Sequence, residues 1–481
     1  MFTHFNLEVL DSITWSLVYI SSIFIRLFQG FFIDSIFLFL LLISSWIVSV
    51  LNSRPQFRQG ARNGIICGFL SVPATLAAVG SSLLYPAILV DIIFSLLFIL
   101  SPTLVPSTDF RFNIIVTLLV TFLFSLTKEN IFILLVTAIF GLMVISCLMK
   151  YAPGSFTLGE FVMVSTLSCL PIKLIFTEEN GIVRFSSIFI VFGVLCLSLA
   201  LLIKRPLCVF IVFFAFIISL HDIPIVLNYL FNTRRLLLVV YCGVVCCIFV
   251  IISAFWKGLQ NFPQIIQRKF FHLMALLVFV PPVMIDCEFL KLCISGAIFM
   301  FLFIESLRIV RFPYVASIVE SYVSGFIDER DSNELILTHL FLLLGLGLPV
   351  LLTPSDMSSL VSNSLICKAL KLSIHVCGIS VLAVGDAAAS VFGVYYGKHK
   401  WPGSKKSYEG TAGAFAGTWI TLSVILIIGQ KCFPFGMILA LIVPSLIGAL
   451  DEAFTSQIDN LTLPFVMIPP IVCSFFLLSN I

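Results

Sequence analysis

The chain has 481 residues, of which 60% are hydrophobic and only 11% are charged. A soluble domain carries roughly 25% charged residues, because its surface must be hydrated. These proportions exclude a secreted, cytosolic or disordered protein and indicate a chain that crosses a membrane many times. The net charge of +3 is too small to indicate a nucleic-acid partner.

Apolar runs predict an all-α polytopic membrane protein, since about 20 apolar residues in a helix cross the hydrocarbon core. Several runs are short or contain proline, so we expect about 14 membrane-spanning helices, with a range of roughly 12 to 16. The candidate spans are 31–51, 64–82, 84–101, 112–126, 130–149, 158–176, 184–203, 205–219, 235–255, 271–287, 290–309, 336–352, 369–393, 411–430, 433–450 and 462–480. Most links are short, so an active site must be built from helix ends and short loops.

The two parts of the chain differ in the polar residues between their spans. Residues 1–260 predict a hydrophobic transmembrane region that serves as scaffold and lipid groove. Residues 261–481 hold most of the charged and glycine-rich segments, so we expect the catalytic region there. The first eleven residues contain no basic segment or cleavage site, so we expect no removable signal peptide. The basic link Lys398–Lys406 predicts a cytosolic loop, because short cytosolic loops are rich in Lys and Arg.

The segment after the apolar run 379–384 combines small residues with a carboxylate. Gly385, Ala389, Gly393 and Gly397 recur every fourth residue, which places them on one face of a helix and allows a second helix to pack closely. Packing does not explain Asp386. An ionisable side chain at the end of an apolar span is costly to bury, so Asp386 is a functional candidate.

The loop that follows has the residue types of a phosphate site. Its lysines can compensate phosphate charge, its glycines allow backbone N–H groups to approach, and the next helix begins with Glu409, Gly410 and Thr411. An interface anchor with Trp401 is the alternative interpretation. The sequence contains no GxxxxGK[ST] motif here, so the loop is not a Walker P-loop.

Three further polar clusters are candidates. The last span is preceded by Glu452, Gln457, Asp459 and Asn460, a set suited to a metal or a nucleotide. Upstream lie the basic group Arg268, Lys269 and His272, which could equally be an interface anchor, and the acidic loop with Asp328 and Asp331, which could equally be a solvated turn. Glu305 and Arg308 are three residues apart on a helix and should neutralise each other.

The motifs in residues 385–411 resemble those of the CTP-dependent polyprenol kinases. The shared pattern is Gly-Asp, Ala-Ser, two glycines, Trp-Pro-Gly-Ser-Lys-Lys and Glu-Gly-Thr, and the other three clusters extend the likeness over about residues 265–481. Trp401-Pro402-Gly403 and Gln457-Ile458-Asp459-Asn460 favour the dolichol-specific branch. The resemblance implies that residues 397–412 form a CTP-binding loop.

What the resemblance implies is transfer of the γ-phosphate of CTP to the terminal hydroxyl of dolichol. Such an enzyme would lie in the endoplasmic reticulum membrane, with its active site facing the cytosol, and its product, dolichyl phosphate, would serve protein glycosylation. Its partners would be dolichol, CTP and membrane lipid, and its cofactor a divalent metal, Mg²⁺ before Mn²⁺ or Ca²⁺.

Residue roles follow from these implications. The expected catalytic residues are Asp386, Lys405, Lys406 and Glu409, and the expected metal ligands are Asp386, Glu409 and Asp459. The expected nucleotide-binding residues are Gly397, Lys398, Lys400, Trp401, Gly403, Ser404, Lys405, Lys406, Ser407, Gly410, Thr411 and Asn460.

Other activities remain open from the sequence. A related lipid kinase acting on phytol, farnesol or diacylglycerol would share the motifs. A CTP:phosphatidate cytidylyltransferase would use the same nucleotide but attack its α-phosphate. A transporter would also have many spans, but it predicts inverted repeats and charges near the middle of the membrane.

Overall fold

The computed structural model describes residues 7–51, 57–58, 61–100, 116–118, 120–121, 124, 129–218, 223–255, 264–323, 335–402, 404–430 and 434–480. These residues form helices and short links. In the described ranges the one β-bridge is isolated and joins Lys400 to Ser407. The all-α fold class is therefore confirmed.

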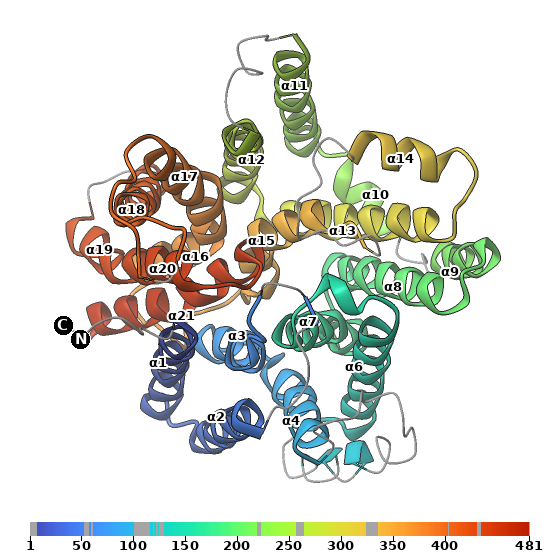
Figure 1. Cartoon of the computed structure of the whole chain (residues 1–481), viewed down its shortest axis with the longest axis horizontal. Helices are drawn as coiled ribbons and strands as arrows, with labels where there is room; N and C mark the ends of the chain where they lie inside the picture. The colour runs from blue at the N-terminus through green and yellow to red at the C-terminus, as the bar shows by residue number, and fades with distance from the viewer. Residues whose placement is uncertain are drawn as a thin grey trace.

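The helices are named as in Figure 1. Those of the first part are α1 (Leu7–Phe28), α2 (Phe32–Leu51), α3 (Ile65–Ala78), α4 (Leu84–Leu100), α6 (Ile131–Tyr151), α7 (Leu158–Thr177), α8 (Gly181–Ile203), α9 (Pro206–Ile218), α10 (Ile223–Leu230) and α11 (Thr233–Phe255). Those of the second part are α12 (Gln264–Ile285), α13 (Cys287–Ile309), α14 (Val315–Val323), α15 (Thr338–Leu352), α16 (Ser364–Ile379), α17 (Asp386–Tyr395), α18 (Tyr408–Gln430), α19 (Phe435–Ala440), α20 (Ile442–Phe454) and α21 (Asp459–Ser479).

Eleven helical segments of the described chain are long and apolar enough to cross a membrane. Shorter apolar helices lie at Ile65–Ala78, Leu84–Ile99, Pro206–Ile217, Met274–Ile285 and Thr338–Leu352. The number of about 14 stays a prediction, because length and composition do not decide which short helices cross. Most of the candidate span 112–126 lies outside the described residues.

Sequence analysis missed α1, which contains the candidate span Val9–Phe28. Its mean hydropathy of 1.3 is low because hydroxyl residues are frequent in it. In the structure these hydroxyls bond to carbonyl oxygens one turn earlier, for example Thr14 to Leu10 and Ser16 to Ser12. These bonds satisfy those hydroxyls within the helix, whereas Ser22 donates to the carbonyl oxygen of Ala74 on α3.

The helices of the two predicted regions pack together. Figure 1 draws α1 to α4, α6 and α7 along the lower side and α16 to α21 on the left, and α21 packs against both α1 and α3. Farther right, α13 packs along α8. The largest hydrophobic core contains residues from both sides of position 260. The division at 260 stays a prediction about function.

The predicted small-residue face is the contact between α17 and α18. Gly385 lies against Thr418, and Ala389 is buried beside Ala414 and Ala449. Gly393 and Gly397 lie near Ser407, just before α18. Between α16 and α17 the helix widens into a π-helical segment, Ser380–Gly385. Such segments are frequent at functional sites, and this one ends directly before Asp386.

Candidate active site

Asp386 lies at the start of α17 in a buried group of charges. Lys269, from α12, forms an ion pair with its carboxylate. His272, one turn further along α12, places Nδ1 3.7 Å from Asp386 Oδ2 and 3.0 Å from the carbonyl oxygen of Leu382. Asp386 is only 7% exposed and His272 8%. The basic pair upstream and the carboxylate after the span therefore meet in space, although 117 residues separate Lys269 from Asp386.

Lys406 forms a second ion pair beside the first. Its Nζ lies 2.5 Å from Glu452 Oε1 and also donates to the carbonyl oxygen of Glu452, on α20. Burial lowers the pKa of Lys406, but the charges of Glu452, Asp459 and Asp386 outweigh it and raise this pKa above its ordinary value. Lys406 is therefore charged at neutral pH. Because it is influenced by Asp386 and Asp459 together, it joins the two carboxylates in one site.

The loop between α17 and α18 folds around Trp401. The backbone N–H of Trp401 donates to the carbonyl oxygen of Lys406 at 3.0 Å, and its indole N–H donates to Thr411 Oγ1 at 2.9 Å. Its ring packs on Tyr408, with centroids 4.0 Å apart, and on Phe454. These contacts hold Lys406 over α20.

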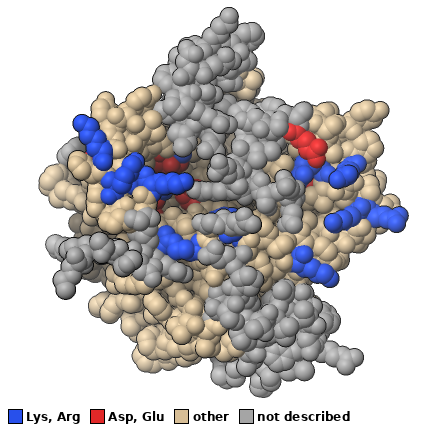
Figure 2. All heavy atoms as spheres, viewed as in Figure 1, with Lys and Arg blue, Asp and Glu red and all other residues tan. Residues whose placement is uncertain are grey.

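Hydroxyl groups shape the rest of this loop. Ser404 Oγ accepts the backbone N–H of Lys406 at 3.1 Å, and Ser407 Oγ accepts that of Gly410 at 3.1 Å. The side chains of Lys398, Lys400 and Lys405 are exposed. Figure 2 shows basic side chains gathered on this face of the molecule, with acidic side chains deeper among them, on the side where Figure 1 draws α17 and α18.

Glu409 lies apart from the two buried ion pairs. Its Oε1 is 2.6 Å from Nδ1 of His399, and its carboxylate also accepts the backbone N–H of His399. In the part of the chain that the structure describes, no three His, Cys, Asp or Glu side chains are grouped as a metal-binding set. The charges of Asp386 and Asp459 both act on Lys406, whereas Glu409 bonds to His399 at the other end of its own loop.

Gln457 bonds to the N-terminal region instead of the lysine loop. Its Oε1 accepts from Thr157 Oγ1 at 2.5 Å, and its Nε2 donates to the carbonyl oxygen of Arg62 at 3.0 Å. Gly64 packs against the same side chain, and a Cβ atom there would overlap it. Gln457 thus joins the two regions directly before Asp459.

Arg58, Arg62 and Glu160 complete this junction and were not predicted. Glu160 accepts from the backbone N–H of Ile458 at 2.7 Å and from Arg58 at 2.9 Å. Arg58 and Arg62 donate in turn to the carbonyl oxygens of Ser456 and Phe454, at 2.9 and 2.6 Å. We name these three residues the N-terminal clamp.

Local signals for the clamp are present in the sequence. Thr157 and Glu160 match a capping box, which the structure forms at the start of α7. The arginines lie in the basic link 54–62, and such links are typical of short cytosolic loops. No local pattern connects either segment to residues 454–458.

The structure does not describe all of the predicted site residues. Gly403, Asp328 and Asp331, and the side chain of Arg268, lie outside the described residues.

Asn460 opens α21, where its backbone N–H bonds to Asp459 Oδ1 at 2.9 Å and its carbonyl oxygen lies against Gly345 of α15. Glu305 and Arg308 form the expected ion pair at 2.7 Å.

Comparison with known proteins identifies the relatives of this chain. It is 34% identical over 208 residues to the human dolichol kinase, an alignment covering 42% of this chain and 37% of that protein. The dolichol kinase EVAN of Arabidopsis thaliana is 31% identical over 256 residues, 51% of this chain and 42% of its own length. The dolichol kinase of Saccharomyces cerevisiae is 31% identical over 206 residues, 42% of this chain and 36% of its own length.

The relatives of this chain are dolichol kinases. The predicted resemblance is confirmed, from mammals to plant and yeast. The chain spans about two fifths of the length of the curated dolichol kinases it matches. No model of a known protein family matches the chain. No solved structure matches it either.

Proposed function

We propose that the protein is a CTP-dependent dolichol kinase, which transfers the γ-phosphate of CTP to the terminal hydroxyl of dolichol. The observation that carries the proposal is the pairing of Asp386 with Lys269 and of Lys406 with Glu452, at helix ends between apolar helices, in a chain related to dolichol kinases. A hydroxyl on a very long apolar chain cannot leave the bilayer, so its site must be made of helix ends.

The lysines would bind the triphosphate. Phosphoryl transfer requires mainly positioning and neutralisation of phosphate charge. Lys406 is charged and held by Glu452, while Lys405 is exposed and can follow the nucleotide. The backbone N–H of Gly410, at the start of α18, donates to Ser407 Oγ and would bind a phosphate oxygen only after that bond breaks. Asn460, at the start of α21, would orient the base or ribose.

Asp386 would act on the attacking hydroxyl. In the proposed step the dolichol oxygen bonds to the γ-phosphorus, the bond from that phosphorus to the β–γ bridging oxygen breaks, and CDP leaves. The hydroxyl proton passes to the carboxylate of Asp386. Lys269 keeps that carboxylate ionised before the step, and His272 lies beside it.

A divalent metal is part of the proposal. Mg²⁺ is usually held by one or two carboxylates together with the phosphates and waters, so Asp386 and Asp459 fit a Mg²⁺–CTP complex. Bound there, the metal would neutralise charge on the transferring phosphate. Glu409, the third predicted ligand, would bind the metal only after its contact with His399 breaks.

The location follows from the reaction. We propose that the protein lies in the endoplasmic reticulum membrane with the lysine loop facing the cytosol, where CTP is available, and that its product serves glycosylation. The apolar helices and the basic loop support this orientation.

The proposal is tested with purified protein and a panel of substrates. Dolichol, phytol, farnesol and diacylglycerol are each incubated with CTP, ATP, GTP or UTP. Dolichyl phosphate formed with CTP supports the proposal. Preferential phosphorylation of diacylglycerol or phytol would assign the protein to a related kinase.

A further inference from the structure

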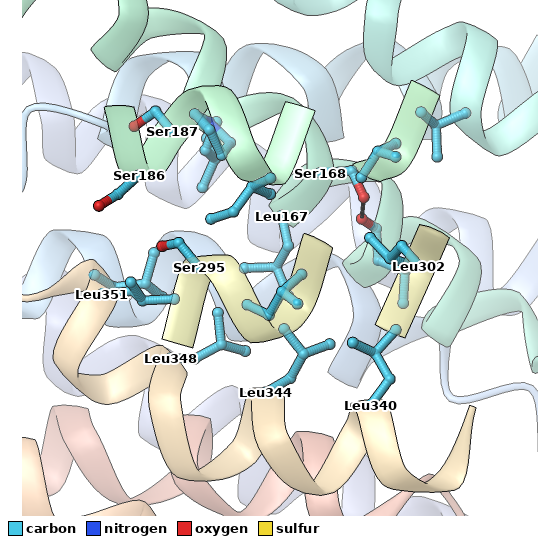
Figure 3. Close-up of a pocket in the computed structure, with 18 of the residues that line it drawn as sticks. Leu167, Ser168, Ser186, Ser187, Ser295, Leu302, Leu340, Leu344, Leu348 and Leu351 are labelled. Atoms are coloured by element: carbon cyan, nitrogen blue, oxygen red, sulfur yellow. Dashed lines mark hydrogen bonds between the residues drawn. The ribbon is translucent and has the colours of Figure 1, made fainter. Parts of the chain in front are cut away.

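An apolar cavity of about 140 Å³ lies between α6, α7, α8, α13 and α15 (Figure 3). Leucines from three of these helices point into it, among them Leu167, Leu302, Leu340 and Leu348. Its polar groups are few. The lining hydroxyls of Ser168, Ser187 and Ser295 bond to carbonyl oxygens of their own helices, and Lys291 is paired with Glu288. Among the described residues that line the cavity, Ser186 is the exception, since its buried hydroxyl has no hydrogen-bond partner. The cavity therefore suits a ligand segment without polar atoms.

The cavity is long and narrow. Its lining extends from Val183 to Ser198 on α8 and from Leu337 to Leu352 on α15. At 1.5 Å per residue, each stretch is about 22 Å long. The volume of about 140 Å³ is distributed along these stretches, so the cavity is a narrow channel. This shape fits an extended hydrocarbon chain.

One end of the channel lies beside the candidate active site. Phe156 lines that end and packs edge-on against Phe341, with ring centroids 5.9 Å apart. The next residue, Thr157, bonds to Gln457, two residues before Asp459. In addition, α15 lines the channel along its length while its Gly345 contacts the backbone of Asn460.

We propose that this channel binds the isoprenoid tail of the alcohol acceptor, with the hydroxyl end toward Asp459 and the tail running along α15. The inference rests on the proposed function and adds the site that selects a long prenol. It uses helices from both sides of position 260, which assigns a substrate-binding role to α6, α7 and α8. The occupant is one extended chain, and an acyl chain of a bilayer lipid is the alternative that the test must separate.

A substitution half-way along the channel provides the test. Leu344→Trp should obstruct the tail of dolichol but not that of geraniol, which ends before this point. We expect kcat/KM for dolichol to fall by about 10-fold or more, while kcat/KM for geraniol stays within about a factor of 2 of the wild type. Leu344→Phe should give a smaller loss in the same direction. Leu202→Trp, on the exposed side of α8, is the matched control and should change neither value.

Other outcomes would overturn the inference. Unchanged activity of both Leu344 variants on dolichol would do so, and so would equal losses on both acceptors. A second measurement does not require turnover: a dolichol analogue with a photoreactive group in its tail should crosslink to peptides of α13 and α15. Crosslinks found only on lipid-facing helices would contradict a tail site, and so would crosslinks that excess dolichol does not reduce. Crosslinks that excess phospholipid reduces as strongly as dolichol would assign the channel to an acyl chain of a bilayer lipid. A wild-type protein inactive on every prenol would contradict the proposed function, and the crosslinks would still decide the channel.

Discussion

At the scale of single residues, the candidate site consists of two neighbouring ion pairs, in which both carboxylates are buried and Lys406 is about one third exposed. Lys269 neutralises Asp386, Lys406 neutralises Glu452, and Asp459 influences Lys406. Burying one charge without a partner is costly, so each pair depends on both members. Asp386 was predicted from its position at the end of an apolar span, and Lys406 from its place in the basic, glycine-containing loop. The sequence could not predict which cation meets Asp386, because the partner comes from a distant helix.

Asp386→Asn should reduce turnover by about 10³-fold, the effect expected when a charged group is removed from a transition state. The variant keeps the size of the side chain but loses the proton acceptor. The measurement is dolichyl phosphate formed per enzyme at saturating CTP. Asp356→Asn, in an exposed loop, is the matched control and should be fully active. Near-normal turnover of Asp386→Asn in correctly inserted protein would remove Asp386 from the mechanism.

The charge of Lys406 should make stability depend on pH at the alkaline end. Its pKa in the folded protein is raised above the ordinary 10.5, so its charge stabilises the fold fully below about that pH. The stabilisation is lost as pH rises through the folded pKa. The difference in unfolding temperature between wild type and Lys406→Met should therefore be constant near neutrality and shrink above pH 10.5. Lys405→Met, an exposed neighbour, is the control, and a difference that grows with pH would contradict the pairing.

At the scale of helices, close packing of α17 on α18 places Asp386 and the lysine loop together. The four-residue spacing predicted this face correctly, because small residues repeated at that interval lie on one side of a helix. The widening of the helix at Ser380–Gly385 was not predicted, since no residue pattern marks it.

Substitution of the glycines at this face should have unequal effects. A Cβ atom at Gly385 would overlap Thr418, whereas one at Gly393 would lie 3.6 Å from Ser407 Oγ, an ordinary contact. We expect Gly385→Ala to destabilise by about 1–3 kcal/mol. Gly393→Ala should be neutral or stabilising by up to about 1 kcal/mol, because alanine favours helix. Unfolding temperatures of the two variants check the prediction, and equal shifts would refute the packing.

The N-terminal clamp should control the position of Asp459. Glu160→Gln leaves Arg58 as a buried, unpaired charge, which commonly costs about 3–5 kcal/mol. We expect a lower unfolding temperature and, in the protein that remains folded, a raised KM for CTP. Glu179→Gln, at an exposed position after α7, is the matched control and should change neither value. Wild-type stability and KM in Glu160→Gln would show that the clamp is dispensable.

At the scale of the whole molecule, residues far apart in the chain meet in one site. Hydropathy predicted the class and nearly all helices, since spans are local features of composition. It missed α1, where hydroxyl residues mask the span, and it gave residues 1–260 the role of scaffold and lipid groove without naming any site residue there. Two residues of that region, Arg58 and Glu160, bond to the segment before Asp459. Phe156 directly precedes Thr157, which bonds to Gln457 in the same segment. Such contacts depend on tertiary packing, which a single sequence does not encode in any local pattern.

The position of the transferred phosphorus tests the central claim most directly. Purified protein is incubated with dolichol and with CTP labelled at either the γ- or the α-phosphate. We predict that label enters the lipid from the γ-position alone and that CDP is released. Asp386→Asn should reduce the transfer by about 10³-fold, while Asp356→Asn should not change it. Incorporation of the α-label, with release of pyrophosphate, would indicate a cytidylyltransferase. Absence of lipid label from both nucleotides would contradict the proposed reaction altogether.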